Sequence, residues 1–190
     1  MKKRFISLLL CTVFATANLY ADDFSLTSPD IANDKPLNKA QIYNGFGCTG
    51  DNISPELHWQ GEPEKTKSFA VTLYDPDAPT GSGWWHWLIY NIPANVHKLE
   101  ANAGNLTAEK APKGSEQNLT DFGSKGYGGA CPPKGSKVHH YQFKVYALDT
   151  EKISLPQNAS SAMLGFQLNA HKLAEAEIVA IYQRDSDVSK

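Results

Sequence analysis

Apolar and polar side chains alternate along several short segments of this 190-residue chain. Alternation combined with β-branched or aromatic residues is typical of half-buried strands. Stretches rich in glycine, proline and asparagine separate the segments and predict turns. The pattern therefore predicts a mainly β protein. The predicted strands are Phe24–Thr27, Glu56–Trp59, Ser68–Tyr74, Trp85–Ile92, His139–Leu148 and Glu177–Gln183.

One late segment has helical periodicity instead. Between Ser160 and Ala176, apolar residues recur every three to four positions, and Ser160 or Ser161 can cap the first turn. We therefore predict a helix over Ser160–Ala176. Many strands with one late helix favour an antiparallel β-sandwich that carries a peripheral helix near its C-terminus.

The stretch 93–121 is polar and shows no strand pattern, so we interpret it as an excursion over the surface. No repeat, low-complexity segment or linker divides the rest of the chain. A chain of this length has room for one ordinary domain. Residues 22–190 are therefore predicted to form a single domain.

The first 21 residues have the pattern of a secretory signal peptide. Lys2, Lys3 and Arg4 precede a short apolar run that ends in small residues. Cleavage is expected after Ala21, with Ala17 as the alternative, and the run is too short to span a bilayer. We expect the mature protein to be periplasmic or secreted, without stable insertion into a membrane.

Charge narrows the range of partners. Loss of the leader removes three of the 18 basic residues and leaves 15 against 20 acidic ones, a net charge of −5. No cluster of lysine and arginine remains. Nucleic acids and anionic membranes attract basic surfaces, so this composition argues against both as partners.

Two cysteines follow the leader, Cys48 and Cys131. An even pair in an exported protein suggests a disulfide, and both residues lie in glycine-rich stretches rather than in predicted strands. The alternative is two buried thiols that never meet.

Titratable side chains gather where the predicted strands begin or end. Asp75 and Asp77 directly follow the segment Ser68–Tyr74, and His86 opens the next apolar run. Polar groups at strand ends are a common way to build a small-ligand pocket on a β-scaffold. There are two plainer alternatives. The aspartates could close a loop by accepting backbone N–H groups, and the histidines could be satisfied within the core.

Strand alternation predicts which of these side chains point inward. Asp75 continues the buried face of Ser68–Tyr74, and His139 and Tyr141 share the inward face of their strand, whereas His140 faces solvent. The residues that the same rule places on the face of His86 are Trp84, Leu88 and Tyr90.

Three motifs together resemble the phosphatidylethanolamine-binding protein family, in its bacterial Raf-kinase-inhibitor-like branch. Asp75–Pro79 is similar to the family's Asp-Pro-Asp-Ala-Pro hallmark, and His86 to its strand-borne histidine. Gly128–Pro133 is similar to its glycine-rich, double-proline loop, which His139 and Tyr141 follow. The motifs occur in the family's order, which makes the resemblance specific.

The resemblance covers residues 24–183 approximately and implies two antiparallel sheets with Greek-key connections and a helix near the C-terminus. It also implies a small preformed pocket for phosphate-type anions or phospholipid headgroups. The residues assigned to the ligand are Asp75, Asp77, His86, Gly129, Pro132, His139 and Tyr141.

A phosphate group needs hydrogen-bond donors, which protonated histidine, backbone N–H groups of the glycine-rich loop and a tyrosine hydroxyl supply. The aspartates repel an anion. Either an aspartate accepts a hydrogen bond from a histidine, or it meets the ammonium group of a zwitterion such as phosphoethanolamine. Both possibilities remain open at the level of sequence.

Other functions stay as alternatives. A hydrolase could use aspartate and histidine as acid and base, although no nucleophile motif accompanies them. The resemblance also allows a regulator that inhibits a protease or kinase through its surface, with an unknown protein partner. Asp75, Asp77, His86 and His139 could in principle hold a metal, but no catalytic residue, cofactor or metal is assigned. Gly45–Gly50 fits a dinucleotide-binding pattern, yet Pro55 blocks the helix that such a site requires.

Overall fold

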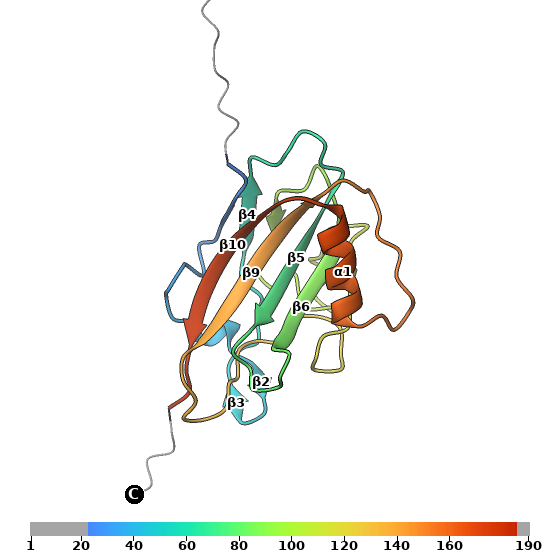
Figure 1. Ribbon diagram of the computed structural model, residues 1–190. Helices are drawn as coiled ribbons and strands as arrows, with labels where there is room; N and C mark the ends of the chain where they lie inside the picture. Colours follow the sequence, from blue (N-terminus) through green and yellow to red (C-terminus); the bar gives the residue numbers. More distant parts are fainter. Residues whose placement is uncertain (1–22, 186–190) are drawn as a thin grey trace, which may run out of the picture.

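The computed structural model describes residues 23–185 and is built around a five-stranded sheet (Figure 1). Neighbouring strands are antiparallel, in the order β10-β9-β5-β6-β8. The mainly β prediction is thereby confirmed. The bounds are β5 Ser68–Asp75, β6 Trp84–Pro93, β8 Glu116–Gln117, β9 His139–Leu148 and β10 Lys172–Tyr182.

A smaller sheet, in the order β1-β4-β7, covers one face of the large one. The main core lies between the two sheets and includes Leu57 and Trp59 from β4, and Phe69 and Val145 from the large sheet. A short hairpin and one turn of 3-10 helix complete this side. The bounds are β1 Ser25–Thr27, η1 Lys39–Gln41, β2 Asn44–Gly45, β3 Cys48–Thr49, β4 Leu57–Gln60 and β7 Lys98–Leu99.

The helix α1 (Ser161–His171), the one α-helix among residues 23–185, packs on the opposite face of the large sheet (Figure 1). Leu164 and Leu168 on its buried side form a second cluster with residues of β5, β6 and β9. Ser160 caps the helix, since its hydroxyl accepts a hydrogen bond from the backbone N–H of Met163 at 3.2 Å. The predicted start of this helix is therefore confirmed.

The predicted end of the helix is wrong. Residues 172–176 belong to β10, which pairs with β9 over almost its whole length. Ala174 lies opposite Ala147 and Ala176 opposite Val145, so small side chains alternate toward the main core while Glu175 points away from it. Alanine, leucine and glutamate favour helices, but pairing with the neighbouring strand outweighs this weak local preference.

The stretch 93–121 is not merely a surface excursion. It contributes β7 to the small sheet and β8 to the large one. Several of its buried side chains are polar: the Trp87 indole N–H donates to Gln117 Oε1 at 2.8 Å, and Asn118 Nδ2 donates to the carbonyl of Ala159 at 3.2 Å. A hydrophobic pattern cannot reveal a segment that is buried through hydrogen bonds.

The predicted leader, residues 1–21, lies outside the described residues, as do both candidate cleavage sites. Within residues 23–185, no helix has the length and apolar character needed to cross a bilayer.

Candidate functional site

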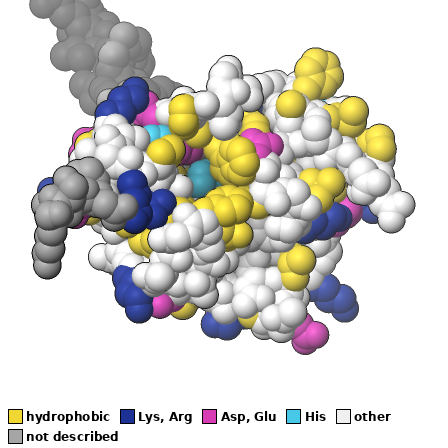
Figure 2. Space-filling view, turned by 90° about the horizontal axis from the view of Figure 1, so that it is seen from below, with side chains coloured by type: hydrophobic (Ala, Val, Ile, Leu, Met, Phe, Trp, Pro, Cys, Tyr) yellow, Lys and Arg dark blue, Asp and Glu magenta, His cyan; other side chains and the backbone are white. Residues whose placement is uncertain are grey.

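A cavity of about 220 Å³ opens at one end of the large sheet. Neighbouring strands are antiparallel, so the end of β5 lies beside the starts of β6 and β9 at this end. Figure 2 looks onto it and shows a histidine inside a hollow rimmed by hydrophobic side chains. The lining residues are Phe46, Asp75, Ala78, Pro79, Thr80, Trp84, His86, Phe122, Cys131, Pro132, Pro133, His139 and Tyr141.

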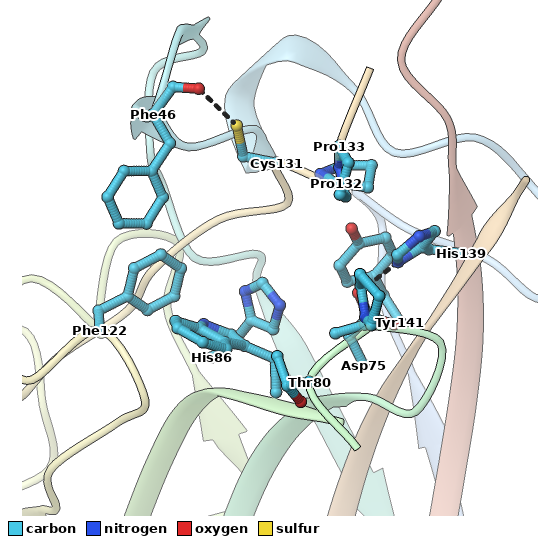
Figure 3. A pocket seen from close by; sticks show the side chains of 13 residues that line it. Phe46, Asp75, Thr80, His86, Phe122, Cys131, Pro132, Pro133, His139 and Tyr141 are labelled. Atoms are coloured by element: carbon cyan, nitrogen blue, oxygen red, sulfur yellow. Dashed lines mark hydrogen bonds and ion pairs between the residues drawn. The ribbon is translucent and has the colours of Figure 1, made fainter. Parts of the chain in front are cut away.

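Asp75 and His139 form a buried pair in this lining (Figure 3). His139 Nδ1 lies 2.7 Å from Asp75 Oδ2, and the two side chains are only 2% and 3% exposed. The backbone N–H of Asp77 donates to Asp75 Oδ1 at 2.9 Å. The carboxylate is therefore held by one side chain and one backbone donor. Of the two roles considered for an aspartate, Asp75 takes that of the histidine's partner.

His86 lines the cavity because of a bulge in β6. Leu73 pairs with Trp87 and Tyr74 with Trp85, which leaves His86 without a partner on β5. The extra residue reverses the alternation beyond it. The prediction that Leu88 and Tyr90 share the face of His86 is therefore wrong: both belong to the cluster under α1.

The His86 ring is buried and fixed by the glycine-rich loop. Its Nδ1 lies 2.8 Å from the carbonyl oxygen of Gly128. A carbonyl can only accept, so Nδ1 must carry the hydrogen. Burial lowers the pKa of His86, while the Gly128 carbonyl and the charge of Asp75 oppose this shift. The neutral ring is thus favoured, with its hydrogen on Nδ1.

The Tyr141 hydroxyl is a buried polar group of the lining that lacks a hydrogen bond of normal geometry. Tyr141 is fully buried, and its hydroxyl, although near the Asp75 carboxylate, forms no hydrogen bond of good geometry with any of residues 23–185. Burial, assisted by the negative charge of Asp75, raises the pKa of Tyr141, so the phenol keeps its proton. Buried polar groups normally have a partner, so this hydroxyl marks a place where a ligand atom fits.

Aromatic rings form the opposite wall. Phe122 stacks with Phe46 at 5.8 Å between centroids and meets Trp84 and His86 edge-on at 5.4 and 5.3 Å. Phe46 is 68% exposed at the rim. Sequence reasoning missed Phe46 and Phe122, because each lies outside the long strands and has no periodic neighbour.

The predicted disulfide between Cys48 and Cys131 is present. It ties the hairpin that carries Phe46 to the double-proline segment of the lining. Arg184, which follows β10, braces the same two segments by donating to the carbonyls of Gly47 at 3.0 Å and Pro132 at 3.2 Å.

Two predicted ligand residues lie outside the lining. Asp77 faces the outside of the loop, where its carboxylate meets Lys137 at 2.9 Å and His140 at 2.7 Å. Partial burial opposes this ionised state, but the hydrogen bonds from Lys137 and His140 prevail and lower the pKa of Asp77 to about 2. Asp77 therefore fits the plainer alternative, an aspartate that closes a loop.

Gly129 is also committed elsewhere. Its backbone N–H donates to Asn52 Oδ1 at 2.7 Å, and that of Gly128 donates to the carbonyl of His86 at 2.9 Å. A Cβ at Gly129 would come within 2.3 Å of the Gln41 carbonyl oxygen, so the residue is a glycine for close packing of the backbone. The two N–H groups that were expected to bind an anion therefore donate to other groups of the protein instead.

The other five predicted residues, Asp75, His86, Pro132, His139 and Tyr141, do lie in the cavity lining. As alternation predicted, His140 on the opposite face of β9 is exposed. Among residues 23–185, no three histidine, cysteine, aspartate or glutamate side chains are grouped to hold a metal ion.

Comparison with known proteins places the chain among its relatives. The family model described as phosphatidylethanolamine-binding protein matches residues 27–183. The chain belongs to this family. Membership of this family agrees with the fold and with the order of the three motifs along the chain.

Two similar relatives are proteins of Escherichia coli. The chain is 53% identical to the UPF0098 protein YbcL of Escherichia coli K12 over 183 residues, covering 96% of this chain and 99% of that one. It is 50% identical to UPF0098 protein YbhB of the same strain over 158 residues, covering 83% and 98%. The crystal structure of E. coli YbcL superposes with a TM-score of 0.83 at 56% identity, covering 85% of this chain and 98% of that one.

Proposed function

We propose that this protein is an exported binding protein whose cavity holds a phosphate-type anion, either a free phosphate ester or a phospholipid headgroup. The observation that carries the proposal is the buried Tyr141 hydroxyl, which belongs to the cavity lining and forms no hydrogen bond of good geometry with the described residues. An anionic oxygen is a strong acceptor for such a donor. The neighbouring His86 and His139 rings supply further polar contacts (Figure 3).

The rest of the lining supports binding of a small ligand. Most of it is apolar and aromatic, with a few polar groups at the bottom, as in typical small-molecule pockets. The family's name describes binding of phosphatidylethanolamine, whose headgroup joins a phosphate to an ammonium group. The aromatic wall of Phe46, Phe122 and Trp84 suits such an ammonium group through cation–π contacts.

Export rests on the leader-like pattern of residues 1–21 and on one further feature. Disulfides form and persist in oxidising compartments, so the bond between Cys48 and Cys131 supports a periplasmic or secreted location. A role in regulating a protein partner through the same rim is compatible with this placement.

Calorimetric titration of the purified protein with methyl phosphate and phosphoethanolamine tests the proposal. We expect both to bind the wild type and Tyr141→Phe to weaken both about tenfold, as loss of one hydrogen bond to a charged group implies. His86→Ala should weaken binding further. His140→Ala is the matched control, since it removes a neighbouring histidine from outside the cavity. Unchanged affinity in Tyr141→Phe would contradict the proposal, and release of inorganic phosphate would favour a hydrolase.

A further inference from the structure

The cavity lacks a fixed positive charge. None of its lining residues is a lysine or arginine, and the one carboxylate in it belongs to Asp75. Partner cations are the usual means of holding a doubly charged anion. An anion in this site must therefore be stabilised by neutral donors, or by protons that arrive with it.

His86 presents an acceptor to the ligand. The Gly128 carbonyl fixes the hydrogen on Nδ1 and leaves Nε2 as the ring nitrogen available to a ligand. In the neutral ring, Nε2 carries a lone pair. Burial lowers the pKa of His86, which opposes conversion of this atom into a donor.

The groups around His86 do not change that assignment. Asp75 at the end of β5 and Asp121 in the loop before the glycine-rich segment carry the negative charges that act on the ring. Asp121 is already engaged, because its Oδ2 accepts from the backbone N–H of Trp85 at 2.8 Å. The Tyr141 ring of β9 meets the imidazole edge-on at 5.3 Å between centroids.

The opposite side of the site supplies a donor. The Tyr141 hydroxyl forms no hydrogen bond of good geometry with the described residues. His139 is engaged through its Nδ1, which lies 2.7 Å from Asp75 Oδ2. One acceptor at His86 therefore faces one donor at Tyr141 across a single small cavity.

We propose that the site selects oxyanions that carry a proton, that is, phosphate monoesters in their hydrogen-phosphate form, over sulfate-type anions of the same shape and charge. The P–OH group donates to His86 Nε2, and an ionised oxygen accepts from the Tyr141 hydroxyl. This inference rests on the proposed function and specifies the ligand class of the same cavity. It adds the requirement that the bound anion carry a proton, which the proposed function does not include.

Methyl phosphate and methyl sulfate form the decisive pair of probes. At about pH 5.5 most methyl phosphate has one negative charge and one proton, because the second pKa of phosphate esters is about 6. Methyl sulfate has the same charge and shape but no proton. It would set an oxygen lone pair against that of His86 Nε2 and leave a buried acceptor unpaired. We expect it to bind about 10- to 100-fold more weakly, the usual effect of an unpaired buried polar group.

Two variants test whether His86 causes the preference for methyl phosphate over methyl sulfate. His86→Phe removes the acceptor but keeps a ring of similar shape, so methyl phosphate should fall to the affinity of methyl sulfate. Tyr141→Phe should weaken both probes by a similar factor and preserve their ratio. If His86→Phe does not fold, the wild-type ratio still decides the question.

The outcomes separate this inference from the function beneath it. Equal affinities of the wild type for the two probes would overturn the inference and leave anion binding intact. Absence of binding by both probes would overturn the proposed function and the inference with it. Preference for methyl phosphate that His86→Phe abolishes supports both.

Discussion

Two aspartates of one short motif take opposite roles at the scale of single residues. Asp75 ends β5 pointing inward and pairs with His139, whereas Asp77 points outward and closes the loop onto the start of β9. The backbone N–H of Asp77 donates to Asp75 Oδ1, so the loop that Asp77 closes also orients the buried carboxylate. A residue outside the cavity thereby helps to position one inside it.

Asp77→Asn should reveal the energetic contribution of this closure. The pKa of Asp77 is lowered from 3.8 to about 2, so the unfolded chain binds a proton more readily than the folded one. The stabilisation is therefore complete above about pH 4 and is lost as the pH falls toward 2. Because the Lys137 partner is 74% exposed, we expect about 1 kcal/mol after screening.

Urea unfolding of the wild type and the variant at several pH values measures this effect. The difference in unfolding free energy should be constant from pH 7 to 5 and shrink between pH 4 and 2. Asp51→Asn is the control, because Asp51 forms an exposed pair with Lys39 that should contribute less than about 0.5 kcal/mol. A difference independent of pH would show that the charge of Asp77 is not the cause.

The connection between β5 and β6 is the element on which the site depends most. It begins at Asp75 and contributes Pro79 and Thr80 to the cavity wall. It leads into β6 shortly before the bulge at His86. Tyr74 holds its far side by donating its hydroxyl to the carbonyl of Ser82 at 2.8 Å. A change in the path of this connection should therefore affect the ligand.

Gly81 and Gly83 provide a matched test of that dependence. Both have positive φ, +84° and +66°, so alanine at either position should cost about 1 kcal/mol in backbone strain. A Cβ at Gly81 meets nothing within 4 Å, whereas one at Gly83 would come within 2.8 Å of the Asp75 carbonyl oxygen and would overlap the Tyr74 hydroxyl. We expect Gly83→Ala to weaken binding of methyl phosphate and Gly81→Ala to leave it unchanged. Equal affinity in the two variants, measured by calorimetry, would disprove the dependence.

Alternation together with β-branched and aromatic content predicted the long strands, and alternation placed Asp75, His139 and Tyr141 correctly as buried. It failed at His86, where the bulge inserts one residue, and at residues 172–176, where strand pairing overrides helical propensity. Local sequence does not encode either effect, because each depends on a neighbouring strand.

The aromatic wall was beyond prediction for a related reason. Phe46 and Phe122 come from segments far apart in the chain, and only the folded molecule brings their rings together. The resemblance to the family indicated which motifs contribute to the pocket. It did not indicate that the N–H groups of the glycine-rich loop are used within the protein.

At the scale of the whole molecule, the open end of the sandwich is secured by a disulfide and by hydrogen bonds. Cys131 lies in the cavity lining and Cys48 in the hairpin behind it, 83 residues earlier in the chain. Arg184, near the end of the described chain, bonds to carbonyls on both sides of the disulfide. The cavity walls are thus joined from three distant parts of the sequence.

The double variant Cys48→Ala/Cys131→Ala should be less stable than the wild type by about 2 to 4 kcal/mol, since an unfolded chain freed of so long a loop gains conformational entropy. The midpoint of urea unfolding measures the loss, and wild type reduced before unfolding should match the variant.

Affinity for methyl phosphate should also fall in the double variant. The segments that carry Phe46 and Pro132 lose the disulfide that joins them, and only the hydrogen bonds of Arg184 remain between them. Arg184→Gln in the oxidised protein is the complementary control and should weaken binding less than loss of the disulfide. An unchanged midpoint in the double variant would show that packing alone holds this end of the molecule together.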